Sequence, residues 1–269
     1  MIYLLTFTAL FIITILFLKL RGKKEKITNE NIIAEVGGLG SGKTLNGSKR
    51  AIKLEKKQLK KWALEKKGQP APILYSNIPL TYKYKNKRYN SIELTLDHLL
   101  MKAKIPQGSV IFIDEFGTLA NQFDWNKKEV KNELTEFIRL YRHYTQGGYL
   151  VLTDQAIDNI VKPVRDRINA VIYNTKTTTL GKLYCNQCVV MRYTSQLDSY
   201  TAQTMNDLIQ RRYGFINRQY DTFTYSEIYN SRIFKELKEY QSDNLKARQV
   251  LSFDIKTKNT NDLGKGETL

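Results

Sequence analysis

Short apolar runs alternate with longer amphipathic stretches through the middle of the chain. A fully apolar run bounded by turn residues, such as Val110 to Ile113 after Gly108, is typical of a buried central strand in a parallel sheet. Strands alternating with helices indicate a doubly wound α/β fold with a mainly parallel sheet. The predicted strands lie at 32–34, 73–80, 110–113, 147–155 and 170–174, and the predicted helices at 43–67, 96–108, 127–146 and 156–168.

The first twenty residues have a different pattern, because no charged residue occurs from Ile2 to Leu18. About 18 apolar residues is near the lower limit for a helix that crosses the hydrocarbon core. Positive charges follow this run and do not precede it, unlike in a cleaved signal peptide. The sequence therefore predicts a transmembrane anchor at 1–20, with the N-terminus outside and the chain after Arg21 in the cytoplasm. A buried core helix is the alternative.

The remaining pattern completes the predicted domain organisation. A polar linker spans 21–30, the α/β core spans 31–175, and a C-terminal extension containing β-strands spans 176–269. Within the extension, Cys185 and Cys188 lie on a predicted strand. Two cysteines exclude a disulfide framework, and without nearby histidines they make only half of a zinc site. We interpret them as ordinary buried thiols, and a metal or redox pair shared between molecules is the alternative.

The charge of the chain narrows the choice of partners. The chain has 43 Lys and Arg residues and 26 Asp and Glu residues, which gives a formal net charge of +17. Its hydrophobic residues, 42% of the total, are enough to form a packed core. Such an excess favours a polyanionic partner, either nucleic acid or an anionic membrane surface. The lysines of the helix at 43–67 fit a solvated face better than contact with DNA. The basic aromatic segment from Arg211 to Tyr220 is a candidate for binding phosphates and unpaired bases, and a strand that packs its tyrosines is the alternative.

The sequence EVGGLGSGKTL lies between the first predicted strand of the core and its first helix, and it fits the spacing G-x-x-x-x-G-K-[ST]. In such a loop, backbone N–H groups and the helix N-terminus surround phosphate oxygens. Lys43 would neutralise the β- and γ-phosphates of ATP, and the Thr44 hydroxyl would bind Mg²⁺. The predicted nucleotide-binding residues are Gly37, Gly38, Leu39, Gly40, Ser41, Gly42, Lys43, Thr44 and Leu45.

An acidic pair follows the apolar strand at 110–113. Asp114 and Glu115 would lie at the carboxyl end of that strand, the edge where ligands bind in open α/β sheets. Asp114 is the predicted Mg²⁺ residue, and Glu115 is the predicted general base for an attacking water. An acid in that position favours hydrolysis over transfer to another acceptor.

Three further residues complete the predicted catalytic set. Gln155 follows the strand at 147–155, so it can sense the γ-phosphate from the same sheet edge. Arg142, near Arg139, and Arg165, near Arg167, are candidates for an arginine finger that completes the site of a neighbouring subunit. For each arginine, a surface role is the alternative.

The segments ILYSNIPL, SVIFIDEFG, YRHYTQGGYLVLTDQ and IDNIVKPVRDRINAVIYN resemble, in order and spacing, the Zot-like (zonula occludens toxin-like) proteins. These are morphogenesis ATPases of filamentous phages, related to the FtsK/HerA group of DNA pumps. The resemblance implies an oligomeric ATPase in the host cytoplasmic membrane that drives single-stranded phage DNA outward while coat or assembly proteins surround it. In the best-known members the membrane helix follows the ATPase domain, whereas here it precedes it.

Two other functions fit the same motifs. A conjugation-type coupling ATPase or DNA-segregation pump would share the N-terminal anchor and the phosphate loop. A nucleotide-gated scaffold would recruit coat or membrane proteins without moving DNA. Glu115 distinguishes the scaffold from the motors, because a scaffold does not require a hydrolytic base.

Overall fold

A computed structural model of the chain describes residues 3, 6–8, 30–65, 68–119, 128–180, 182–191, 209–215, 233, 235–236 and 239. Most of the predicted anchor and linker, and most of the extension beyond residue 191, lie outside these residues. Among the described residues, no helix combines the length and the hydrophobicity needed to cross a bilayer.

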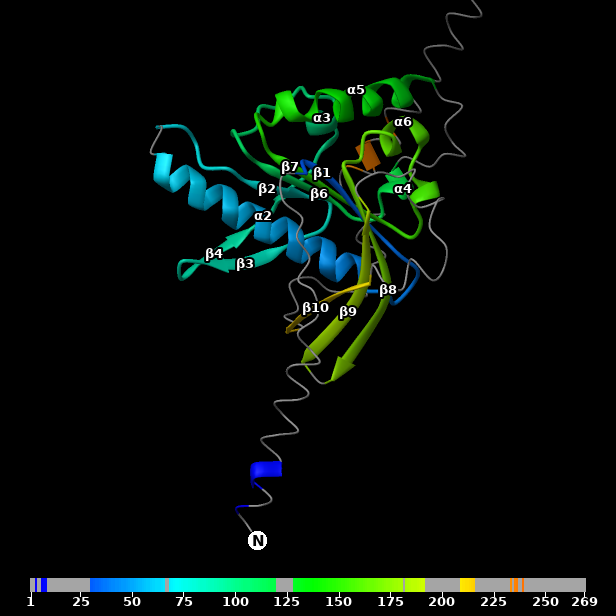
Figure 1. Cartoon of the computed structure of the whole chain (residues 1–269). Coiled ribbons are helices and arrows are strands. Elements are labelled where there is room, and N and C mark those ends of the chain that lie inside the picture. The colour runs from blue at the N-terminus through cyan, green and yellow to red at the C-terminus, as the bar shows by residue number, and fades with distance from the viewer. Residues whose placement is uncertain are drawn as a thin grey trace, which may run out of the picture.

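An eight-stranded sheet organises the described core (Figure 1). Its order is β10–β9–β8–β1–β7–β6–β2–β5, in which the strands from β8 to β5 are mutually parallel while β9 and β10 are antiparallel to their neighbours. The strands are β1 (Ile32–Val36), β2 (Leu74–Ser76), β5 (Ile92–Glu93), β6 (Val110–Ile113), β7 (Tyr149–Asp154), β8 (Ala170–Leu180), β9 (Leu183–Met191) and β10 (Gln210–Phe215). The predicted α/β fold with a mainly parallel sheet is confirmed.

Helices cover both faces of this sheet. The long helix α2 (Lys43–Glu65) packs on one face, and α5 (Lys128–Tyr144) lies on the other (Figure 1). The shorter helical elements are α3 (Leu96–Leu99), α4 (Phe116–Leu119), η2 (Ile157–Asn159) and α6 (Lys162–Arg165). A separate antiparallel hairpin, β3 (Thr81–Tyr84) with β4 (Lys87–Asn90), packs beside α2.

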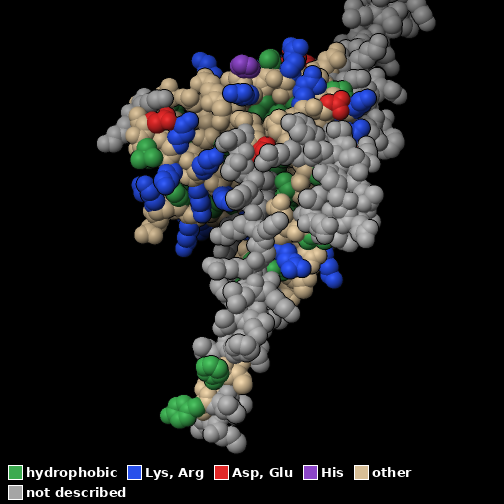
Figure 2. All heavy atoms as spheres, viewed as in Figure 1, with side chains coloured by type: hydrophobic (Ala, Val, Ile, Leu, Met, Phe, Trp, Pro, Cys, Tyr) green, Lys and Arg blue, Asp and Glu red, His purple; other side chains and the backbone are tan. Residues whose placement is uncertain are grey.

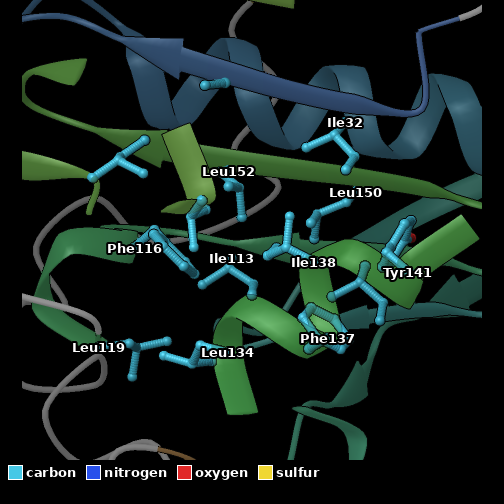
Figure 3. Packing of buried hydrophobic residues seen from close by; sticks show 14 of the residues in the cluster. Ile32, Ile113, Phe116, Leu119, Leu134, Phe137, Ile138, Tyr141, Leu150 and Leu152 are labelled. Carbon is cyan, nitrogen blue, oxygen red and sulfur yellow. The ribbon is translucent and has the colours of Figure 1, made fainter. Parts of the chain in front are cut away.

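Alternating side chains of β6 and β7 build the two hydrophobic layers, because successive residues of a strand face opposite sides. Val110 and Phe112 pack with α2, whereas Ile111 and Ile113 pack with α5. Figure 3 shows the second layer, in which side chains of α5 lie against Ile113, Leu150 and Leu152. Helices therefore cover both faces of the sheet, and the ends of its strands remain available to bind a ligand.

The sheet continues beyond the predicted end of the core at residue 175. β8 begins at the predicted position but continues through Thr175 to Leu180, so the predicted boundary at 175/176 falls inside a strand. β9 and β10 then extend the same sheet. Threonine-rich strands suit an exposed, pleated surface, which explains how β8 continues beyond the apolar run.

Candidate nucleotide-binding site

Three neighbouring strands bring the predicted site residues to the carboxyl edge of the sheet. The loop from Gly37 to Gly42 follows β1, Asp114 and Glu115 follow β6, and Gln155 follows β7. β7 lies between β1 and β6, so its end separates the phosphate loop from the acidic pair. Ligands of open α/β sheets bind at this edge.

The phosphate loop has a backbone that favours glycine. Gly40 and Gly42 have φ angles of 72° and 86°, in the left-handed region. A side chain at Gly42 would collide with the Thr177 hydroxyl, and one at Gly37 would lie 2.5 Å from the Asn174 carbonyl oxygen. Among the described residues, the buried Ser41 hydroxyl has no hydrogen-bond partner. The loop thus holds a buried polar group whose partner must come from a ligand or solvent.

The lysine of the loop contacts the predicted general base. Lys43 Nζ lies 2.9 Å from Glu115 Oε1, and both side chains are largely buried. Glu115 has a φ angle of 50°, an uncommon conformation for a residue with a side chain, and its N–H donates to the Thr153 hydroxyl at 3.1 Å. A bound phosphate would compete with Glu115 for the Lys43 ammonium group.

Asp114 is a buried carboxylate near Lys43, whose ammonium group pairs with Glu115. It is 4% exposed, its Oδ1 accepts a hydrogen bond from the Thr153 hydroxyl, and the Thr44 hydroxyl also bonds to it. Burial raises the pKa of Asp114 to about 6, and the nearby Glu115 carboxylate adds to this shift. Asn77 fixes the Asp114 backbone, accepting from its N–H at 2.8 Å and donating to its carbonyl at 2.9 Å.

Thr44 and Asp114 fit a Mg²⁺ ion that is bound together with nucleotide phosphates. Mg²⁺ keeps several waters and takes one or two carboxylates plus phosphate oxygens. Burial keeps the pKa of Asp114 raised even though Lys43 attracts its ionised form, so a bound cation would favour that form further. In the part of the chain that the structure describes, no cluster of three or more His, Cys, Asp or Glu side chains forms a separate metal site.

Asp154, which sequence reasoning missed, ties the acidic turn to the end of β7. Its carboxylate accepts from the Gly117 N–H at 2.5 Å, the Gln155 N–H at 2.7 Å and the Asn159 amide at 2.8 Å. Its carbonyl accepts from the Gly37 N–H at 3.2 Å. Asp154 therefore connects the phosphate loop, the acidic turn and the Gln155 backbone. In the sequence, only its position next to Gln155 at the end of a predicted strand suggested that Asp154 belongs to the site.

The other predicted catalytic residues are Gln155, Arg165 and Arg142. Gln155 is at the predicted edge with an exposed side chain. Arg165 pairs with Asp158 at 2.5 Å, and Arg142 is exposed in the last turn of α5, which leads into the start of β7. Arg142 thus lies at the opposite edge of the sheet from the phosphate loop of its own chain. The catalytic roles of these three residues stay predictions.

A second polar cluster lies beneath the phosphate loop and was also missed. Glu35 on β1 is fully buried, and its Oε1 lies 2.7 Å from Arg50 of α2 and 2.7 Å from Arg212 of β10. Asn174 donates to Glu35 Oε2 at 2.9 Å and accepts from Arg212 at 2.6 Å. Local sequence patterns could not reveal this cluster, because Glu35 and Arg212 are 177 residues apart.

The cluster reaches the phosphate loop through β8 and β9. The Thr177 hydroxyl donates to the Ser41 carbonyl at 2.5 Å, and the Asn186 amide donates to the same carbonyl at 2.9 Å. Asn186 in turn accepts from Arg212 at 3.1 Å. The strands beyond the predicted core boundary therefore help to shape the loop. Within the described residues neither cysteine of β9 forms a disulfide, and Cys188 is buried.

Residues 32–206 match the family model described as Zonular occludens toxin (Zot). The chain belongs to the Zot family. Its resemblance to this family, expected from the sequence, is confirmed, and the family match covers the phosphate loop, the acidic pair and β8 with β9.

Solved structures with weak overall similarity accompany this match. The N-terminal domain of zonular occludens toxin from Neisseria meningitidis is 13% identical, with a TM-score of 0.44, covering 76% of this chain and 99% of that one. A KaiC-like protein, PH0186, from Pyrococcus horikoshii OT3 is 12% identical, with a TM-score of 0.28, covering 61% and 81%. EssC (ATPases 2 and 3) from Geobacillus thermodenitrificans is 12% identical, with a TM-score of 0.23, covering 81% and 39%. No curated protein matches the sequence.

Proposed function

We propose that this Zot-family protein is a membrane-anchored ATPase that couples ATP hydrolysis to the movement of DNA through the cytoplasmic membrane during virion assembly. The observation that carries the enzymatic part is the convergence of Lys43, Thr44, Asp114 and Glu115 at one sheet edge. Each of these residues has the chemical type that ATP hydrolysis requires. Membership of the Zot family supports the assignment to virion assembly.

The ion pair between Lys43 and Glu115 supports an order of events in catalysis. While this ion pair is intact, the ammonium group of Lys43 is bound to the Glu115 carboxylate, the group that would act as the base. A phosphate bound in the loop would take over Lys43 and free Glu115 to accept a proton from water. Mg²⁺ held by Thr44 and Asp114 would neutralise phosphate charge. Glu115 is thus available as a base only when substrate is present.

DNA and membrane are proposed partners on the strength of the sequence. The net charge of +17 favours a polyanion, and the apolar run from Ile2 to Leu18 supports a single membrane pass that leaves the ATPase in the cytoplasm. Coat or assembly proteins and further copies of this chain are the protein partners we propose. A conjugation-type coupling or DNA-segregation ATPase would use the same site.

Hydrolysis by the full-length protein in detergent tests this function. Lys43→Ala should lose ATP binding, whereas Glu115→Gln should bind ATP and hydrolyse it about 10²- to 10⁴-fold more slowly, as expected for loss of a general base. Glu93→Gln removes an exposed carboxylate outside the site and should retain full activity. Stimulation by single-stranded DNA would support the motor, and DNA-independent binding of ATP without hydrolysis would instead support a nucleotide-gated scaffold.

A further inference from the structure

Two elements that are distant in sequence form one strongly basic face. Lys56 Nζ lies 5.9 Å from the centre of the Tyr82 ring, and Ala51 and Ile52 of α2 share a hydrophobic cluster with Leu80 and Tyr82. Figure 2 shows Lys and Arg side chains gathered over α2 and the β3–β4 hairpin. The exposed or half-exposed bases of this α2–hairpin face are Lys53, Lys56, Lys57, Lys60, Lys61, Lys83, Lys85, Lys87 and Arg88.

Carboxylates on and near these elements do not balance the nine bases. Glu65 pairs with Lys61 at 3.8 Å, and Glu93 on β5 is a second exposed acid. Glu55, the remaining acid of α2, faces inward and is 1% exposed. Burial raises the pKa of Glu55 to about 8, so this side chain is mainly neutral at pH 7. The α2–hairpin face therefore keeps a large positive excess.

The bases also stand at spacings that reduce folding stability. Lys83 lies directly opposite Arg88 in the hairpin, and like charges in that position repel each other. In α2, Lys57 is four residues from both Lys53 and Lys61, a spacing at which like charges destabilise a helix. A face kept only for solubility usually mixes the two signs. The arrangement is therefore better explained by an anionic partner that neutralises it.

We propose that the α2–hairpin face binds the phosphate backbone of nucleic acid. This inference rests on the proposed function and names the surface that would hold the DNA. Lys53 to Lys61 span about 12 Å of helix axis at about 1.5 Å per residue, and the hairpin widens the face beside them. Lysine ammonium groups contact phosphates without reading bases, so the binding is independent of sequence.

The distribution of apolar side chains favours nucleic acid over a lipid surface. Surfaces that lie on membranes combine bases with apolar side chains that enter the bilayer. Among the described residues, no large hydrophobic side chain is exposed on the β3–β4 hairpin, and those of α2, Trp62 and Leu64, are confined to its final residues. The centre of the face is basic and polar.

The other basic candidate, the segment from Arg211 to Tyr220, is less suited to this role. Arg212 is committed to Glu35, with two guanidinium contacts at 2.7 and 3.0 Å, so it cannot reach a phosphate without breaking a buried ion pair. Only Arg211 remains as an exposed base among the described residues of β10. Residues 216–220 lie outside the described residues.

A charge-matched pair of variants of the full-length protein in detergent tests the proposal. The hairpin variant combines Lys83→Gln, Lys85→Gln, Lys87→Gln and Arg88→Gln. The control removes four exposed lysines outside the face: Lys102→Gln, Lys104→Gln, Lys162→Gln and Lys182→Gln. Fluorescence anisotropy measures binding of a labelled, mixed-sequence single-stranded 30-mer, and of the same sequence as a duplex, between 50 and 300 mM KCl.

The hairpin variant should bind single-stranded DNA at least about tenfold more weakly at 100 mM salt, and the slope of log K against log salt should flatten by about 3 if all four bases contact phosphates. The control should change affinity less than about threefold. The melting temperature of the hairpin variant should not fall, because the repulsion within the hairpin is relieved. ATP hydrolysis without DNA should be unchanged.

Four results would overturn the proposal. Equal losses in both variants would mean that only net charge matters. Unchanged DNA binding by the hairpin variant, together with lost binding to vesicles containing 30 mol% phosphatidylserine, would identify a membrane surface. If the wild type binds DNA and is stimulated by it, and the hairpin variant behaves in the same way, this surface is refuted and the proposed function stands. If the wild type neither binds DNA nor is stimulated by it, both this surface and the proposed function are refuted.

Discussion

Glu35 and Asp114 are both buried carboxylates in the same sheet, but their surroundings differ. Glu35 is held by two arginines and an asparagine. Burial by itself would raise the pKa of Glu35, but attraction to Arg212 and Arg50 outweighs this and lowers it to about 2. Burial raises the pKa of Asp114 to about 6, and the Glu115 carboxylate adds to this rise. The hydrogen bonds from two threonine hydroxyls and the charge of Lys43 offset it only in part.

The difference separates a structural role from a functional one. The Glu35 cluster is complete within the chain, because each of its carboxylate oxygens has a charged or amide partner. It joins β1, α2 and β10, and it connects to the phosphate loop through Asn186. The Asp114 region has one ammonium group, that of Lys43, for two carboxylates, an imbalance that suits a site that binds a cation with its substrate.

The largest expected effect is the loss of stability when the complete cluster is broken. Glu35→Ala leaves Arg50 and Arg212 without their carboxylate in a buried position, which should lower the free energy of unfolding by about 3–5 kcal/mol. For a domain of this size, that corresponds to a fall of about 10 °C in melting temperature.

Urea unfolding and thermal melting measure this effect, with Glu93→Ala as the control at an exposed carboxylate. The control should change stability by less than about 0.5 kcal/mol. A loss below 1 kcal/mol in Glu35→Ala would show that the cluster contributes little, and would remove the contrast with Asp114.

The sequence predicted the phosphate loop and the acidic pair because each is encoded by a few residues in a row. Lys43, Thr44, Asp114 and Glu115 meet as expected, since parallel strands bring their carboxyl ends to one edge. The five predicted strand positions correspond to β1, β2, β6, β7 and β8, because each of these strands contains a short run of buried apolar residues.

Pairings between distant segments were not predictable. No local pattern places β7 between β1 and β6, and none pairs Glu35 with Arg212. Arg212 lies in a basic aromatic segment that suggested DNA contact, although its charge is used inside the fold. In the sequence, Asp154 does not differ from any other acidic residue at the end of a strand. The three hydrogen bonds that its carboxylate accepts are seen only in the structure.

A second, smaller effect concerns the dependence of stability on pH. Because the folded pKa of Asp114 is raised from 3.8 to about 6, its contribution to stability is complete below pH 3.8 and is lost as the pH rises to about 6. Glu35, whose pKa is lowered from 4.5 to about 2, has the opposite sign: its contribution is present above pH 4.5 and is lost as the pH falls towards 2.

Asp114→Asn should therefore stabilise the nucleotide-free protein by about 2 kcal/mol at pH 7, since it removes an unpaired buried charge. The gain should disappear as the pH falls to 4, where Asp114 is protonated in the wild type. Urea unfolding of both proteins at pH 4, 5, 6 and 7 measures the difference. A constant difference across this range would contradict a titrating Asp114, and the variant should hydrolyse no ATP at any pH.

The smallest expected effect tests whether the two regions are coupled. Thr177→Val removes one of the two side-chain hydrogen bonds to the Ser41 carbonyl while keeping the shape of the side chain, and Asn186 still donates to that carbonyl at 2.9 Å. The variant also loses the hydrogen bond that the Asn186 amide donates to the Thr177 hydroxyl at 2.9 Å, which does not involve the loop itself. Losing the bond to the Ser41 carbonyl costs about 1 kcal/mol. Because the carbonyl belongs to the phosphate loop, we expect this cost to change the loop conformation, so that ATP binds about fivefold more weakly.

Thr175→Val, at an exposed position two residues earlier on β8, serves as the control. Among the described residues its hydroxyl donates to the Gln187 carbonyl, away from the loop. Calorimetric titration with ATP and Mg²⁺ measures both affinities. Equal affinities in the two variants would mean that β8 and β9 support the loop without influencing it, and that the Glu35 cluster is confined to folding.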